Sequence, residues 1–206
     1  MRTVTIKKEV FKFEELSDRA KDEVRVWLGD WGYWDDWSCE YEDFIRMAEI
    51  LGIEIDTRPI KLMGGGYRNE PKIFWSGFYH QGSYLVFEGR YRYAKGAVKR
   101  MKAETNDETL IGIAEALQAA QRPYFYRLEA VMSTRGHDYM VVDVMDREDS
   151  YREIPDTEVE SAMRDFAQWM YKYLQTDYEY RNSDEYIKET CDANDYEFDN
   201  NGRIVK

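Results

Sequence analysis

The spacing of hydrophobic residues divides this chain into helical and extended segments. Apolar residues recur every three or four positions in some stretches, as on the buried face of an amphipathic helix. The clearest repeat of this kind is Val159, Met163, Phe166, Met170 and Leu174. Together with capping residues, this pattern predicts helices over residues 17–31, 40–51, 95–105, 106–122 and 155–174, and a short one over 183–194.

Other stretches alternate apolar and polar residues or are rich in aromatic residues, which favours strands. Turn residues join some of them, because residues 80–83 and Arg135-Gly136 are typical of hairpin turns. The glycines at 64–66, followed by Pro71, indicate a loop, and Asn200-Asn201-Gly202 predicts a tight turn near the C-terminus. The predicted strands are residues 3–13, 53–60, 72–79, 84–93, 125–134 and 137–145.

The order of these elements predicts an α+β fold. Strands cluster in hairpins and do not alternate strictly with helices, so we expect an antiparallel or mixed sheet with about five helices packed on it. A chain of 206 residues suits a single domain, 1–206, and residues 155–206 could form a helical subdomain at its C-terminus.

Composition indicates a folded protein that needs no covalent or metal staple. The chain is 43% hydrophobic and 16% aromatic, which is enough to build a core. Its two cysteines, Cys39 and Cys191, are far apart in the sequence and fit free thiols in a reducing compartment. We find no pattern of a signal peptide or spanning helix, so we expect a cytoplasmic protein with no membrane partner.

The charge of the chain is −12 and is distributed unevenly. Residues 56–102 carry 10 basic and 3 acidic side chains, whereas residues 138–206 carry 8 basic and 19 acidic ones. The overall negative charge disfavours direct binding of nucleic acid by the whole chain and favours a basic partner. The alternative is that acidity only keeps the protein soluble.

A tryptophan-rich segment is the most distinctive local feature. Trp27, Trp31, Trp34, Trp37 and Tyr41 follow one another at steps of three or four, with Asp30, Asp35 and Asp36 between them. Such spacing places the rings along one side of a helix. We favour an ordinary aromatic core, and an exposed aromatic and acidic protein-binding surface is the alternative.

The basic middle of the chain suggests a second kind of site. Basic and aromatic residues on a predicted hairpin, residues 72–93, are what single-stranded nucleic acid binding requires. The favoured alternative is that these cations are solvated or pair with the acidic C-terminal third.

Signals for metal, cofactor or catalytic chemistry are weak. His80, His137, Cys39 and Cys191 lack the paired spacing of a zinc site, and the glycines at 64–66 lack the Lys-Ser/Thr of a phosphate loop. The acids around Asp143 are more typical of a solvated loop than of a divalent-ion site. We therefore expect no enzyme activity, no cofactor and no metal.

The acidic C-terminal segments are the predicted partner-binding site. Tyrosines stand among carboxylates there, a combination that suits recognition of a basic protein surface. A pair of solvated helices is the alternative. The predicted contacts are Asp177, Tyr178, Glu179, Tyr180, Asp184, Glu185, Tyr186, Glu189 and Asp192.

Several segments resemble an uncharacterised family of accessory proteins encoded by phages and prophages, some of which are labelled antitoxin-like. The resemblance implies a phage accessory gene, a setting in which inhibitors of host defence are common. The matching segments span most of the chain and are residues 13–21, 73–78, 81–82, 87–91, 114–118 and 193–198.

The leading hypothesis is a non-enzymatic phage protein that acts in the host cytoplasm. It would bind a host protein, such as a defence or nucleic-acid-handling factor, and inhibit it by occupying a basic or nucleic-acid-binding surface. One alternative is an antitoxin-like partner of a toxin. Others are a nucleic-acid-binding module that uses hairpin 72–93, and a divalent-ion-dependent hydrolase that uses Asp143 and its neighbours.

Overall fold

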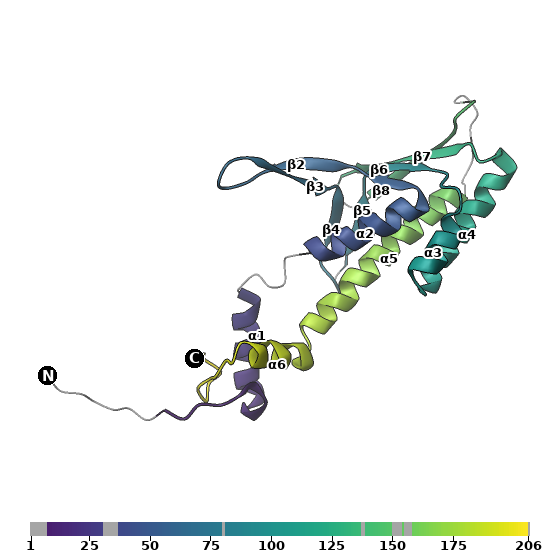
Figure 1. Ribbon diagram of the computed structural model, residues 1–206. Helices are drawn as coiled ribbons and strands as arrows, with labels where there is room; N and C mark the ends of the chain where they lie inside the picture. Colours follow the sequence, from purple (N-terminus) through teal and green to yellow (C-terminus); the bar gives the residue numbers. More distant parts are fainter. Residues whose placement is uncertain are drawn as a thin grey trace. The chain divides into compact units, whose positions relative to one another are not determined.

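The computed structural model describes residues 8–30, 37–79, 81–136, 139–149, 154 and 158–205, which fall into two compact units (Figure 1). Unit 1 takes its residues from Met1–Trp37 and Gln175–Lys206, and unit 2 from Ser38–Leu174. The sequence instead suggested a C-terminal subdomain from residue 155. The chain is an α+β protein, as predicted, and every paired strand in the described residues is antiparallel.

Unit 2 contains a four-stranded sheet and two separate two-stranded hairpins. The sheet has the order β1-β6-β7-β8, and the hairpins are β2–β3 and β4–β5. The strands are β1 (Ile53–Ile55), β2 (Thr57–Lys61), β3 (Tyr67–Pro71), β4 (Ile73–Ser76), β5 (Tyr84–Phe87), β6 (Gly89–Arg92), β7 (Leu128–Arg135) and β8 (Tyr139–Asp146). The helices are α2 (Ser38–Leu51), α3 (Ala97–Glu104), α4 (Glu108–Gln121), which continues into the 3-10 turn η2 (Arg122–Tyr124), and the first part of α5 (Glu158–Arg181).

The helices of unit 2 lie on one side of the sheet (Figure 1). Tyr91, Ala130 and Met132 point to this side and are buried, whereas Arg90 and Val131 point to the other side and are exposed. This alternation is expected when one face of an antiparallel sheet carries the core. The core is aromatic: Phe87 packs edge-on against Phe166 at 5.8 Å, and Phe44 packs against Trp169 at 5.5 Å.

One buried polar side chain joins α4 to the sheet. The Gln121 amide donates to the Leu128 carbonyl at 2.7 Å, and the Leu128 N–H donates back to Gln121 Oε1 at 3.0 Å. The amide also donates to the Tyr91 hydroxyl at 3.3 Å. Since each buried polar group has a partner, the contact fixes the end of α4 over β7 without a desolvation penalty.

The two hairpins and the β1–β6 strand pair of the sheet meet at a junction formed by Asp56, Lys72 and Glu88. These residues separate β1 from β2, β3 from β4, and β5 from β6. Their backbones form a closed ring, because Asp56 N–H donates to Glu88, Glu88 to Lys72, and Lys72 to Asp56, at 2.9, 3.0 and 2.7 Å. Lys72 Nζ lies 2.8 Å from Glu88 Oε2 and 3.9 Å from Asp56 Oδ2, so the central side chains are also paired.

Unit 1 combines the two ends of the chain. Its elements are the 3-10 turn η1 (Phe13–Glu15), α1 (Asp18–Asp30), the whole of α6 (Asp184–Ala193) and the last residues of α5. Phe11 and Phe198 exchange backbone hydrogen bonds of 2.8 and 2.9 Å, which ties the C-terminal segment to the segment before α1. Trp27 packs edge-on against Tyr196, with ring centroids 5.2 Å apart. The buried core comprises Phe13, Leu16, Ala20, Val24, Leu28, Ile187, Cys191 and Phe198.

The predicted helices are confirmed within two residues where the structure describes them, except that the helix predicted to end at residue 174 continues to Arg181. Several strand predictions are wrong. Residues 53–60 are split at Asp56, and residues 84–93 are split at Glu88 into strands of two different sheets. Residues 125–127 precede β7, and the predicted loop up to Pro71 contains β3. In the predicted strand 3–13, residues 3–7 lie outside the described part, and Phe11 forms only an isolated bridge. None of the described helices is both long and apolar enough to span a membrane.

Candidate functional site

The structure places the predicted partner-binding residues in unit 1, at the end of α5 and in α6. Ser183 caps α6, as its hydroxyl accepts the Tyr186 N–H at 3.3 Å. Ile187 and Cys191 face the core of unit 1 and are fully buried. Helical geometry then puts Glu185, Glu189 and Asp192 on the opposite side, because they follow one another at steps of four and three.

Glu185, Glu189 and Asp192 define what we call the acidic face of α6, and all three are exposed. Within the described part of the chain, none of them forms an ion pair. Lys188, the one basic residue of α6, instead pairs with Glu14 at 3.1 Å. The carboxylates of the acidic face are therefore available to a partner.

Two other predicted contacts are neutralised inside unit 1. Asp184 pairs with Arg25 of α1, which also holds Asp22 at 2.5 Å. Asp177 Oδ2 lies 2.6 Å from Arg181 Nε, and the guanidinium of Arg181 lies over the ring of Trp37 at 4.7 Å. These two acids hold the unit together and do not belong to the acidic face.

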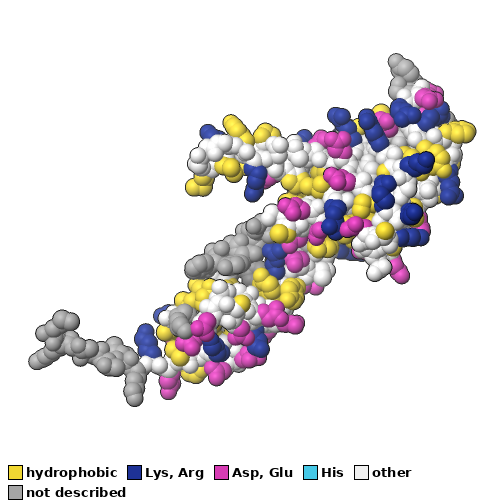
Figure 2. Space-filling model, viewed as in Figure 1, with side chains coloured by type: hydrophobic (Ala, Val, Ile, Leu, Met, Phe, Trp, Pro, Cys, Tyr) yellow, Lys and Arg dark blue, Asp and Glu magenta, His cyan; other side chains and the backbone are white. Residues whose placement is uncertain are grey.

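Tyrosines flank the acidic face. Tyr180 is 45% exposed, packs edge-on against Tyr186 at 5.3 Å and donates its hydroxyl to Glu189 Oε2 at 3.2 Å. The negative charge of Glu189 is the main cause that raises the pKa of Tyr180. The ring pair and the carboxylates thus form one surface of mixed apolar and negative character. Figure 2 shows many Asp and Glu side chains over α1 and α6, with fewer Lys and Arg among them. Tyr178 is partly buried and Glu179 is exposed.

The tryptophan-rich segment is core where the structure describes it. Trp27 packs against the core of unit 1, and Trp37 is buried under Arg181. Tyr41 of α2 accepts a hydrogen bond from Trp75 Nε1 at 3.1 Å in unit 2. Trp31, Trp34, Asp35 and Asp36 lie outside the described residues, as does the side chain of Asp30.

The structure divides the predicted basic hairpin at 72–93 between β4–β5 and β6, and of its cations Arg90 and Arg92 are exposed. Leu85, Val86 and Phe87 of β5 are buried, and Lys72 is engaged at the junction. Hydrophobic packing of β4 and β5 under the helices is the physical reason, because a strand rich in aromatic residues gains most by burial.

The candidate metal and nucleophile residues do not converge in the described residues. No group of three His, Cys, Asp or Glu side chains is found there, and His80 and His137 lie outside that part. Asp146 is buried and pairs with Arg127 at 3.0 Å, whereas Asp143 lies exposed on the sheet. Cys39 and Cys191 are free thiols, and burial raises the pKa of Cys191 to about 11, so this thiol stays protonated at neutral pH.

The sequence missed an exposed two-stranded ribbon, the β-arm, which consists of β2, β3 and the turn at residues 62–66 between them. Thr57 to Lys61 pair in register with Pro71 to Tyr67. The arm projects from the rest of unit 2 (Figure 1). The three glycines at its tip are the signal that could have indicated a hairpin turn, as Gly65 and Gly66 both have positive φ.

Comparison with known proteins identifies one family. The model of a domain of unknown function, DUF8835, matches residues 34–184, which include all of unit 2 and the end of α5. No curated protein and no solved structure matches the chain.

Proposed function

We propose that this chain, which belongs to the DUF8835 family, is a non-enzymatic binding protein that uses the acidic face of α6 to contact a basic surface on a protein partner. The observation that carries the proposal is the set of three exposed carboxylates, Glu185, Glu189 and Asp192, without an ion pair in the described residues. Almost all of α6 follows the end of the family match at residue 184, so the acidic face is a property of this chain's own C-terminal segment.

Electrostatics and shape support a basic partner. Three like charges on adjacent helical turns attract a surface of opposite sign at long range and increase the rate of association. Tyr180 and Tyr186 add aromatic area beside these charges, and tyrosine is enriched where protein surfaces bind each other.

The setting implied by the sequence resemblance suggests what the partner is. A phage accessory protein could inhibit a host defence or nucleic-acid-handling protein by binding the basic groove that normally holds nucleic acid. Carboxylates spaced along a helix would compete there with phosphates, which makes inhibition by occupancy the proposed mechanism.

A charge-reversal variant tests the proposal. We expect Glu185→Lys/Glu189→Lys to reduce affinity for the partner at least about tenfold, which corresponds to about 1.4 kcal/mol. Both side chains are exposed, so the fold should be preserved. Partners would be captured from host lysate with the original chain, identified, and their affinities measured at increasing salt, with circular dichroism as the check of folding.

The matched control is Glu9→Lys/Glu23→Lys. It makes the same change of charge in unit 1, at exposed residues that are not part of α6. We expect this control to bind nearly as well as the original chain. Equal binding by both variants would contradict the proposal, as would a partner that nucleic acid does not displace. A toxin encoded beside the gene as the captured partner would indicate the antitoxin-like alternative.

A further inference from the structure

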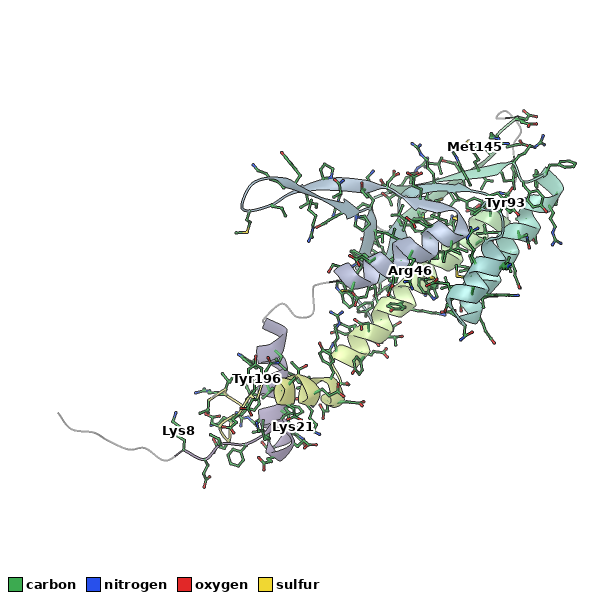
Figure 3. All side chains as sticks on the ribbon, viewed as in Figure 1. Lys8, Lys21, Arg46, Tyr93, Met145 and Tyr196 are labelled. Carbon is green, nitrogen blue, oxygen red and sulfur yellow. The ribbon has the colours of Figure 1, made fainter. Side chains whose placement is uncertain are left out.

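The β-arm of unit 2 is exposed on both of its faces. All residues of the turn at 62–66 are exposed, as are most residues of β2 and β3. Side chains project from both sides of the ribbon (Figure 3). An isolated two-stranded ribbon gains little stability in water, so nothing in packing alone accounts for the length of this arm.

The tip of the arm presents apolar side chains to solvent. Met63 is fully exposed, and Leu62 and Tyr67 are 44% and 71% exposed. Exposed apolar side chains grouped at one place indicate a contact surface, whereas single ones do not.

The arm is positively charged, in contrast to the chain as a whole. It carries Arg58, Lys61 and Arg68 against one acid, Glu70. Both arginines share that carboxylate, Arg68 at 2.6 Å and Arg58 at 3.9 Å. Lys61 forms no ion pair within the described residues and pairs across the ribbon with Tyr67. A net charge of two remains, concentrated around an apolar tip, as the Lys and Arg side chains along the arm show in Figure 2.

The base of the arm is held firmly. Both strands start or end at the junction of Asp56, Lys72 and Glu88, where backbone and side chains are paired. Arg58 also lies over the ring of Phe74 in β4, at 5.3 Å. The arm is thus anchored at one end and presents its tip to a partner.

We propose that the β-arm binds double-stranded DNA, with its ribbon in a groove and its three cations on the phosphates. A two-stranded ribbon fits the major groove, which is about 12 Å wide. Cations along such a ribbon neutralise phosphates, and apolar side chains at its tip contact bases. Charge complementarity selects DNA over a protein partner, because phosphates line both walls of the groove. This function is additional to the acidic face of α6 and does not depend on it.

The experiment measures binding of the full-length chain to a labelled duplex of about 20 base pairs by fluorescence anisotropy. We expect binding at about 50 mM salt. As the salt concentration is raised, the logarithm of the association constant should fall linearly with the logarithm of the salt concentration, with a slope between about −2 and −3, as three phosphate contacts predict. The variant Lys61→Glu/Arg68→Glu should bind at least about tenfold more weakly and with a slope of about −1 or less. Met63→Ser should weaken binding several-fold without changing the slope.

The matched control is Lys95→Glu/Lys99→Glu, which makes the same charge change at exposed residues of unit 2 outside the arm. The proposal predicts that this control keeps most of the affinity. It is overturned if the original chain does not bind the duplex, if both double variants lose binding equally, or if a single strand binds more tightly than the duplex. The proposal is also overturned if the original chain does not bind DNA and the arm variant no longer captures a protein partner, because the arm would then be a protein-binding surface. The α6 variant Glu185→Lys/Glu189→Lys should retain DNA binding, which separates this test from that of the proposed function.

Discussion

Two aromatic residues at the end of α4 adopt a backbone conformation that glycine normally takes. Phe125 and Tyr126 have φ of 52° and 63°. The Tyr126 N–H donates to the Gln121 carbonyl at 3.0 Å and the Phe125 N–H to the Arg122 carbonyl at 3.3 Å, so these residues close the helix terminus. Phe125 is 79% exposed and therefore gains little burial in return for this strain.

Replacing Phe125 tests the strain directly. Phe125→Gly and Phe125→Ala both remove the ring, but only glycine adopts positive φ without steric cost. We expect the glycine variant to have the higher free energy of unfolding, by about 1 kcal/mol. Urea unfolding followed by circular dichroism measures the difference. An alanine variant as stable as the glycine variant would show that the left-handed conformation is not populated in solution.

At the scale of elements, the junction of the two hairpins with the β1–β6 strand pair depends on Glu88. Its carboxylate accepts from Lys72 Nζ at 2.8 Å and from the Thr134 hydroxyl at 2.6 Å. The hydrogen bond from Lys72 makes the largest contribution to lowering the pKa of Glu88, and the hydrogen bond from Thr134 makes the next largest. The ionised form is therefore favoured by the fold.

This lowered pKa makes the junction sensitive to acid. A carboxylate whose pKa is lower in the folded chain contributes stability above its unfolded pKa, about 4.3, and loses it as pH falls through the folded pKa. We expect Glu88→Gln to be less stable than the original chain at pH 7, with the difference shrinking below about pH 4. Urea unfolding across this range measures it, with the exposed Glu42→Gln as control. A difference that stays constant with pH would contradict the role of the carboxylate.

At the scale of the whole molecule, the chain divides into two units with separate cores. Close backbone contacts hold each of them. A Cβ on Gly202 would lie 2.1 Å from the Ala20 carbonyl oxygen in unit 1, and one on Gly89 would lie 2.3 Å from the Glu54 carbonyl oxygen in unit 2. Neither distance is possible without displacement of the backbone.

Substitution of these glycines tests whether the units unfold separately. We expect Gly202→Ala to increase amide hydrogen exchange in α1 and α6 while β6 and β7 remain protected. Gly89→Ala should have the opposite pattern. Exchange measured by mass spectrometry reports both, and equal acceleration in the two units after either substitution would show that they unfold as one cooperative body.

The sequence by itself determined the helices and the outward-facing side chains of α6. Helical periodicity relates residues three or four apart, so Ile187 and Cys191 on one face place Glu185 and Glu189 on the other. The cap at Ser183 and the β7–β8 hairpin are also local, because they depend on neighbouring residues.

Only the tertiary structure decided which of these acids are available and where the basic surface lies. Asp184 and Arg25 are 159 positions apart, and no local pattern predicts that they pair. Most of β2 lay in the predicted strand 53–60, but β3 was missed because it faces water over most of its length and so lacks the alternation that marks a half-buried strand. The junction of Asp56, Lys72 and Glu88 arises only when the two hairpins and the β1–β6 strand pair come together, since its hydrogen bonds join residues distant in the chain. Long-range chain closure, which local residue preferences do not encode, determined the Asp184–Arg25 pair and the junction.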